Sequence, residues 1–289
     1  MNKKAYTLGL YEKAMPNGLS WRDKLIIAKE TNYDFVEMSI DETDEKLARL
    51  NMSIEERLEL VKTMYETGIH IQSICLSGHR KYPMGSNDPK ICQMSMDIMC
   101  KTIRLAEDLG VRIIMLAGYD VYYEMSTEET RNRFFVNLKT AVQMAAKTGV
   151  LLAFETMETE FMNTVQKSMK YVNAIGSPYL KIYPDSGNIT NAALSYKIDV
   201  LQDLKKGEKN LVAMHLKETA PGRFRDMMYG EGHVDFKNII HVVWSMGVRR
   251  FVTEFWYLPN GDWKKDLVYA HDSMTAFLDK EEQIECWSN

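Results

Sequence analysis

Four potential metal ligands stand at matching positions along the sequence, each at or near the carboxyl end of a short apolar run. They are Glu155, Asp185, His215 and Glu254. Any one of them alone could belong to a structural ion pair or, for the histidine, to a core hydrogen bond. If the ends of these runs meet in the fold, the three carboxylates would lie close together and would repel one another without a cation. Three carboxylates and an imidazole therefore predict a site for one divalent metal ion, Zn²⁺, Mn²⁺ or Mg²⁺.

The elements that must position these residues are eight apolar runs separated by amphipathic helical patterns. The runs are 6–11, 34–40, 69–77, 111–117, 150–156, 180–185, 211–217 and 249–255. They are continuously apolar rather than alternating, which is typical of parallel strands covered on both faces. Eight strand–helix units without linkers predict an α/β fold, a single (β/α)8 TIM barrel that forms one domain over residues 1–289. An open doubly wound sheet is the alternative, but no glycine-rich phosphate fingerprint follows the first run.

Several helix boundaries are visible as capping signals. Ser53 with Glu56 forms a capping box, Ser126 can cap the helix that follows it, and Asp235 opens another helix that Gly247 closes. Glycines between a helical pattern and the next run predict left-handed helix ends. These glycines are Gly68, Gly110 and Gly149.

Composition excludes several classes of function. The net charge of −4 gives no general basic surface for nucleic acid. No apolar run is long enough to span a membrane, and the first sixteen residues lack the apolar core of a signal peptide. The four cysteines form no CxxC pair and are expected to be reduced thiols. We therefore expect a cytoplasmic protein without nucleic-acid or membrane partners.

The four ligands resemble the set found in xylose-isomerase-like barrels, specifically the ketose 3-epimerases. Longer stretches resemble the L-ribulose-5-phosphate (L-xylulose-5-phosphate) 3-epimerases. These stretches are FVEMSIDETDEKLARL (35–50), CLSGHRKYPMGS (75–86), LAGYDVYYE (116–124), YPDSGN (183–188), HLKETAPGRF (215–224) and YGEGHVDF (229–236).

This resemblance implies a metal-dependent isomerase that inverts carbon 3 of a phosphorylated L-ketopentose. The expected reaction converts L-xylulose 5-phosphate to L-ribulose 5-phosphate in L-ascorbate and pentose catabolism. A bound cation would polarise the carbon 2 carbonyl and stabilise an enediolate. Glu155 and Glu254 flank Asp185 and His215 in strand order, so they are the expected pair of catalytic proton-transfer groups.

Two departures favour a phosphorylated substrate over a free sugar. Related non-phosphorylated ketose epimerases have a histidine where this chain has Asn188, and an arginine where it has Pro221. Basic groups should then hold the distal end of a sugar phosphate. The residues that we expect to contact substrate are Glu37, His79, Arg80, Glu158, Asn188, Lys217, Arg225 and Gly232. Solvated loop charges are the alternative for Lys217 and Arg225, and a salt bridge is the alternative for Glu37.

Other functions on the same barrel remain open at this point. An aldose–ketose isomerase or a polyol dehydratase could use the same ligands. An abasic-site endonuclease needs more histidine ligands and a basic DNA face, and a catalytically silent sugar-binding barrel would show no turnover. Barrels that resemble this one often pair, which suggests a homodimer.

Overall fold

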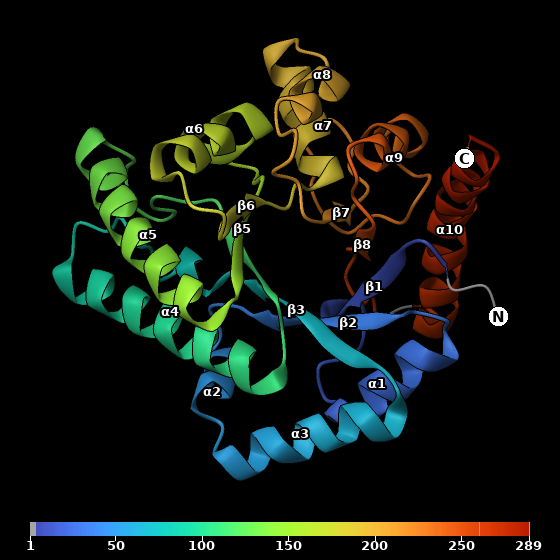
Figure 1. The fold of residues 1–289 in the computed structure, drawn as a ribbon, viewed down its shortest axis with the longest axis horizontal. Coiled ribbons are helices and arrows are strands. Elements are labelled where there is room, and N and C mark those ends of the chain that lie inside the picture. Colours follow the sequence, from blue (N-terminus) through green and yellow to red (C-terminus); the bar gives the residue numbers. More distant parts are fainter. Residues whose placement is uncertain (1–3, 260, 289) are drawn as a thin grey trace.

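The computed structural model describes residues 4–259 and 261–288, and its centre is a curled sheet of eight parallel strands (Figure 1). The strands are β1 (Thr7–Tyr11), β2 (Phe35–Ile40), β3 (His70–Leu76), β4 (Ile113–Ala117), β5 (Leu151–Glu155), β6 (Leu180–Ile182), β7 (Met214–Leu216) and β8 (Arg250–Thr253). Their order in the sheet is β6-β5-β4-β3-β2-β1-β8-β7. Strands that follow one another in the sequence are therefore neighbours in the sheet, except β6 and β7, which stand at the two ends of the order; β1 also pairs with β8.

Backbone contacts also join the two ends of this order. Isolated parallel bridges connect Ile182 with Leu211 and Asp185 with His215. The His215 N–H donates to the Pro184 carbonyl over 2.9 Å. These contacts bring the β6 segment beside the β7 segment, as closure of the sheet into a barrel requires, and they do not fit an open doubly wound sheet.

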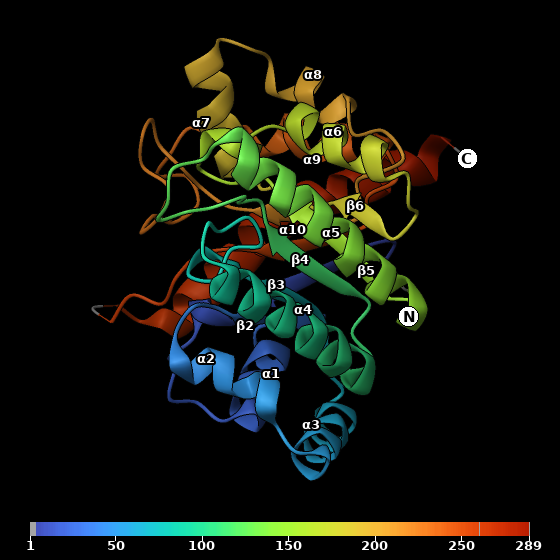
Figure 2. The ribbon, with the colours of Figure 1, turned by 90° about the vertical axis from the view of Figure 1, so that its left-hand side faces the viewer.

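Helices surround the sheet on its outer side (Figures 1 and 2). The α-helices are α1 (Trp21–Glu30), α2 (Asp44–Ala48), α3 (Ile54–Thr67), α4 (Pro89–Leu109), α5 (Glu128–Thr148), α6 (Val165–Ile175), α7 (Ser186–Tyr196), α8 (Val200–Lys205), α9 (Phe236–Ser245) and α10 (Trp263–Ser288). Short 3-10 helices are η1 (Glu12–Ala14), η2 (Arg49–Asn51), η3 (Gly78–Arg80) and η4 (Glu160–Met162). All eight predicted strands are present, and each is shorter than its predicted run by one to four residues in total.

The apolar core has two layers. The larger layer packs between the strands and the helices and includes Leu8, Val36, Leu152 and Phe251. The smaller layer fills the inside of the sheet and includes side chains from most strands. Its members are Tyr11, Phe35, Cys75, Ile113, Met115, Ala153, Tyr183, Ala213 and Val252.

Close packing inside the sheet also explains a glycine in β1. A Cβ atom at Gly9 would lie 2.4 Å from the ring of Phe35, which is fully buried. The interior has no room for both groups, so β1 needs a residue without a side chain at this position.

Most predicted capping signals are confirmed. Ser53 and Glu56 form a capping box at α3, and Asp235 caps α9. The three predicted glycine caps all have positive φ, as expected for left-handed helix ends; they are Gly68, Gly110 and Gly149. The C-cap of α9 is Met246, and Gly247 follows it with φ 91°.

The prediction for Ser126 is wrong. The N-cap of α5 is Thr127, which forms a capping box with Thr130. The Ser126 hydroxyl instead donates to Asp120 over 2.8 Å. Two adjacent hydroxyl residues give the same capping signal, and the contact with Asp120 decides between them.

Within the described residues, none of the helices has the length and apolar character needed to cross a bilayer. Cys75, Cys92 and Cys100 are free thiols, and the side chain of Cys286 lies outside the described part of the chain.

Candidate metal centre

The strand pattern places the four predicted ligands in one layer above the inner core. Successive side chains of a strand point to opposite faces, so residues two apart share a face. Glu155, Asp185, His215 and Glu254 each follow by two positions a residue of the inner core, namely Ala153, Tyr183, Ala213 and Val252. All four therefore point into the sheet's interior at its carboxyl end, which is where barrels carry their active sites.

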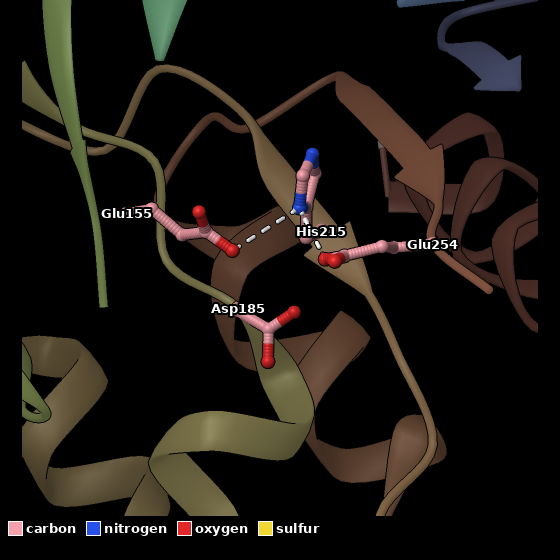
Figure 3. Close-up of side chains that lie close together, drawn as sticks. All are labelled: Glu155, Asp185, His215 and Glu254. Carbon is pink, nitrogen blue, oxygen red and sulfur yellow. Dashed lines mark hydrogen bonds and ion pairs between the residues drawn. The ribbon is translucent and has the colours of Figure 1, made fainter. Parts of the chain in front are cut away.

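The four side chains converge (Figure 3). One potential ligand atom from each residue lies within 4.8 Å of the others, and all four residues are buried. His215 Nδ1 lies 2.6 Å from Glu254 Oε2 and 3.7 Å from Glu155 Oε1. In Figure 3, Glu155 and Glu254 approach from opposite sides, with His215 and Asp185 between them.

Asp185 stands beyond the end of β6 because Pro184 has no N–H to continue the strand. It becomes the N-cap of α7, and its Oδ1 accepts the Asn188 N–H over 2.6 Å. Its Oδ2 is buried and has no hydrogen-bond partner among the described residues. A buried carboxylate oxygen without a hydrogen bond is costly unless a positive charge compensates it. Lys217 Nζ lies 3.2 Å away, and a bound cation would compensate the charge further.

A buried lysine accompanies the cluster. Lys217 Nζ lies 3.2 Å from Asp185 Oδ2 and 4.0 Å from Glu254 Oε2. It also donates to Asn188 Oδ1 over 2.9 Å. Burial alone would lower the pKa of Lys217, but the nearby carboxylates, Asp185 first, raise it above its ordinary value. The side chain is 5% exposed, so Lys217 is a charged member of the site and the solvated-loop alternative is wrong.

Burial and mutual repulsion shift the carboxyl groups in different directions. Burial raises the pKa of Asp185 well above its ordinary value, and burial together with the Glu254 charge raises the pKa of Glu155. Burial would also raise the pKa of Glu254, but Lys217 and His215 hold it well below its usual range.

The imidazole responds to the same charges. Burial alone would lower the pKa of His215, but Glu37 and Glu254 hold it well above its ordinary value. Protons on Asp185, Glu155 and His215, or another positive charge beside them, therefore stabilise the cluster. A divalent cation supplies that charge, and the donor set of three carboxylates and one imidazole fits it.

A small cavity opens above the cluster. Its lining includes Glu155, Asn188, Lys217 and Glu254 at the base, and charged and aromatic residues around the mouth. Those at the mouth are Lys13, Arg80, Glu158, Arg225 and Trp256. The structure therefore brings Asn188, Lys217, Arg80, Glu158 and Arg225 beside the ligands, as predicted for substrate contacts.

Glu158 organises the mouth of the cavity. One of its carboxylate oxygens lies 3.8 Å from both Arg80 Nη2 and Arg225 Nη2. Its other oxygen accepts the Tyr119 hydroxyl over 2.9 Å. The Arg225 guanidinium also lies over the Trp256 ring, 5.4 Å from its centroid. Both arginines can thus reach a ligand that enters the cavity.

Three predicted substrate contacts lie outside the cavity lining: Glu37, His79 and Gly232. Glu37 is the third residue of β2 rather than its last, and it contacts His215 beneath the cavity. His79 is buried and its Nε2 contacts the Ser95 carbonyl. Neither residue belongs to the described lining of the cavity.

Gly232 also lies outside the described lining of the cavity, in a turn that binds a carboxylate of the protein itself. The Glu218 carboxylate accepts the Gly230 N–H over 3.0 Å and the Val234 N–H over 3.1 Å. A Cβ atom at Gly232 would lie 2.1 Å from the Thr219 carbonyl oxygen. The glycine is there for this close backbone approach, and a protein carboxylate already occupies the turn.

Sequence reasoning missed several cavity residues, among them Tyr11, Lys13 and Cys75. Tyr11 is the last residue of β1, so the strand-end rule that found the ligands could have found it. Lys13 pairs with Asp41 over 2.5 Å at the mouth. Its position depends on η1, a short helix that has no clear signal in the sequence.

Comparison with known proteins decides the family. Residues 25–273 match the family model described as a xylose isomerase-like TIM barrel. The L-ribulose-5-phosphate 3-epimerases UlaE of Shigella sonnei (strain Ss046) and Escherichia coli O157:H7 are each 41% identical over 286 residues, 99% of both chains. The chain belongs to the L-ribulose-5-phosphate 3-epimerase family of xylose isomerase-like TIM barrels. It is therefore an isomerase-class enzyme, as the sequence resemblance predicted.

Solved structures with only 15–16% sequence identity to this 3-epimerase family member have the same fold. An L-ribulose 3-epimerase superposes with a TM-score of 0.78, 16% identity and 98% coverage of both chains. A D-tagatose 3-epimerase-like protein gives 0.79 and 15% identity, covering 96% of this chain and 98% of the other. A D-allulose 3-epimerase from Methylomonas sp., in complex with D-allulose, gives 0.74 and 16% identity, covering 95% and 98%.

Proposed function

We propose that this protein is a metal-dependent 3-epimerase that interconverts L-xylulose 5-phosphate and L-ribulose 5-phosphate in L-ascorbate and pentose catabolism. The observation that carries the proposal is the convergence of Glu155, Asp185, His215 and Glu254 within 4.8 Å of one another. This cluster stands in a chain that is 41% identical to named L-ribulose-5-phosphate 3-epimerases.

These four residues would hold one divalent ion, Zn²⁺, Mn²⁺ or Mg²⁺. When bound, such an ion acts as a Lewis acid toward the carbonyl and hydroxyl oxygens of a ketose. Carboxylate and imidazole ligands accept all three of these ions.

In this proposal, the carboxylates of Glu155 and Glu254 transfer the proton. Inversion at carbon 3 requires removal of a proton from one face and its return to the other. Glu155 and Glu254 approach the cluster from opposite sides (Figure 3), and both line the cavity. One glutamate removes the carbon 3 proton, and the other donates a proton to the opposite face of the planar enediolate. Lys217 and Asn188 lie in the same cavity and can hydrogen-bond substrate hydroxyls.

The phosphate group of the substrate would meet the basic residues at the cavity mouth. Arg80 and Arg225 contact Glu158 only at 3.8 Å, so both guanidinium groups retain hydrogen-bonding capacity for an anion. Lys13 adds a third positive charge to the same lining. A phosphorylated ketopentose therefore suits this cavity better than a free sugar.

The proposal is tested by comparing kcat/KM for L-ribulose 5-phosphate and free L-ribulose with the metal-loaded enzyme. Each charge-assisted contact contributes about 1.5–3 kcal/mol, so the phosphorylated substrate should be better by roughly two orders of magnitude or more. Arg225→Ala should lower kcat/KM for the phosphorylated sugar roughly 10-fold or more and leave the value for the free sugar nearly unchanged. Equal efficiency on both sugars would contradict the assignment of the substrate. NMR identification of the product distinguishes 3-epimerisation from aldose–ketose isomerisation and from dehydration.

We also propose that the enzyme is cytoplasmic and forms a homodimer. A sugar-phosphate substrate and three free thiols support a cytoplasmic enzyme without nucleic-acid or membrane partners. A homodimer remains a prediction, and sedimentation velocity of the purified protein tests it.

A further inference from the structure

We infer that Glu37 is a positioning residue that orients the His215 imidazole and directs its Nδ1 atom toward the metal. This inference rests on the proposed metal site. It replaces the sequence-based expectation that Glu37 binds a substrate hydroxyl.

The contacts of Glu37 form a chain that ends at His215. Glu37 Oε1 lies 2.5 Å from His215 Nε2, and Glu37 Oε2 accepts the Ser73 hydroxyl over 2.6 Å. A carboxylate oxygen only accepts, so the contact with Glu37 keeps a hydrogen on Nε2. Nδ1 also lies beside a carboxylate, that of Glu254, but Glu254 belongs to the proposed ligand set and Glu37 does not. Nδ1 is therefore the nitrogen that would bind a cation, while the chain Ser73–Glu37–His215 holds Nε2 on the other side.

The opposite side of the imidazole faces the acidic cluster. Nδ1 lies 2.6 Å from Glu254 Oε2 and 3.7 Å from Glu155 Oε1. Histidines that bind metals generally donate their other N–H to a carboxylate or carbonyl, which fixes both the tautomer and the ring direction. The geometry of Glu37 matches that role.

Neighbouring rings limit rotation of the imidazole. The Tyr183 ring lies edge-on to His215, with centroids 4.9 Å apart and planes at 71°. The Tyr11 ring also lies near His215, with ring centroids 6.1 Å apart. His215 is fully buried among these groups, so an alternative ring orientation would require them to move.

Glu37 is poorly placed to bind substrate. It is 0% exposed, and both of its carboxylate oxygens are already engaged. The described lining of the cavity includes Glu155 and Glu254 but not Glu37. Its effect on the reaction must therefore pass through His215.

The test measures metal binding without substrate in the full-length apoprotein. Zn²⁺ affinity is determined by competition with a chromophoric chelator, and the visible spectrum of the Co²⁺-loaded protein reports on the ligand geometry. Outer partners of metal-binding histidines typically contribute roughly 10- to 100-fold in affinity. Glu37→Ala should weaken Zn²⁺ binding by about that factor and change the Co²⁺ spectrum.

Two milder variants keep the test decisive if Glu37→Ala does not fold. Glu37→Gln keeps an acceptor oxygen without the charge, so its affinity should lie between those of wild type and Glu37→Ala. Ser73→Ala removes only the donor to Glu37 and should cause the smallest loss.

Asp203→Asn is the matched control. Asp203 is a buried carboxylate that accepts the Val165 N–H over 2.7 Å at the start of α6, away from the ligands. Its loss should lower the melting temperature without changing Zn²⁺ affinity or the Co²⁺ spectrum. Wild-type affinity and spectrum in Glu37→Gln and Ser73→Ala would overturn the role of Glu37. A wild-type protein that binds no metal would overturn both this role and the proposed function.

Discussion

At the scale of single residues, Asp185 shows how one carboxylate serves both the fold and the site. Its Oδ1 caps α7, while its Oδ2 makes no hydrogen bond within the described residues and lies 3.2 Å from Lys217 Nζ at the ligand cluster. The cap fixes the direction of the side chain before any cation binds. This is the preorganisation that a metal centre needs, because less ordering remains to be done on binding.

His215→Ala should reduce metal content sharply and abolish turnover while the fold survives. The imidazole is the one nitrogen ligand of the proposed set, and its removal leaves three buried carboxylates that repel one another. Elemental analysis of the purified variant measures metal content, and circular dichroism checks folding. His241→Ala is the matched control, because His241 is a half-exposed residue on α9 that pairs with Glu281. Full metal occupancy in the His215 variant would place the site elsewhere.

The residues that could be predicted are those whose position follows from one strand. Strand periodicity places Glu155, His215 and Glu254 at the same level, and no knowledge of partners is needed. Sequence reasoning did not foresee the contacts of Glu37 and Gly232, because both depend on partners outside their own strand or turn. The contact from Glu37 to His215 spans 178 residues, and no local pattern records it.

At the scale of elements, one carboxylate connects the first two strand–helix units. Glu12, in η1, is buried and accepts from Lys24 of α1 over 3.0 Å and from Lys46 of α2 over 2.6 Å. It also accepts from Arg49 over 2.5 Å and from the Ser39 N–H of β2 over 2.8 Å. These contacts set where η1, and with it Lys13 at the cavity mouth, lies.

This arrangement makes a pH-dependent contribution to stability. Burial alone would raise the pKa of Glu12, but Arg49, Lys24 and Lys46 lower it from 4.5 to about 2. A folded-state pKa below the unfolded value means that the contribution is full above about 4.5 and is lost as the pH falls toward about 2.

Glu12→Gln should therefore lower the free energy of unfolding at neutral pH by about 3–5 kcal/mol, because it leaves buried cations without their counter-charge. The difference from wild type should shrink below pH 4.5. Denaturant unfolding over a pH series measures both. Glu66→Gln, which breaks an exposed pair with Arg22, should leave the free energy of unfolding nearly unchanged, because solvent screens that pair. A difference between wild type and Glu12→Gln that stays constant as the pH falls would refute this account.

Elements were predicted well where a single pattern defines them and less well where two signals compete. The apolar runs gave the strands, but β6 stops at Ile182 because Pro184 interrupts hydrogen bonding two residues later. At α5, Thr127 rather than Ser126 forms the cap because Ser126 bonds to Asp120. In both cases the boundary depends on backbone or side-chain partners that a run of residue types does not contain.

At the scale of the whole molecule, the site depends on strands from both ends of the sheet order. The proposed ligands come from β5, the segment after β6, β7 and the residue after β8, while Glu37 comes from β2. The bridge between Asp185 and His215 joins the two ends of the sheet order at the proposed metal site. The contacts that close the sheet therefore also bring the proposed ligands together.

We therefore expect residues 1–289 to unfold as one domain. Denaturant unfolding followed by tryptophan fluorescence and by far-ultraviolet circular dichroism should give coincident single transitions. Saturating Zn²⁺ should shift both transitions together, since an ion that binds only the folded state stabilises the whole cooperative unit. Two separate transitions, with only one shifted by metal, would contradict the single-domain prediction.

The most direct test of the proposed mechanism is deuterium incorporation at carbon 3 in metal-loaded Glu155→Gln and Glu254→Gln. Glutamine keeps the size and an oxygen ligand but removes the proton-transfer group. Mass spectrometry of L-xylulose 5-phosphate and L-ribulose 5-phosphate incubated separately in D₂O reports exchange from each epimer. Each variant should retain metal and lose most epimerisation, and each should still exchange the carbon 3 proton of one epimer, a different one for each variant. Interconversion at near wild-type rates in both variants would show that the two glutamates do not move the proton.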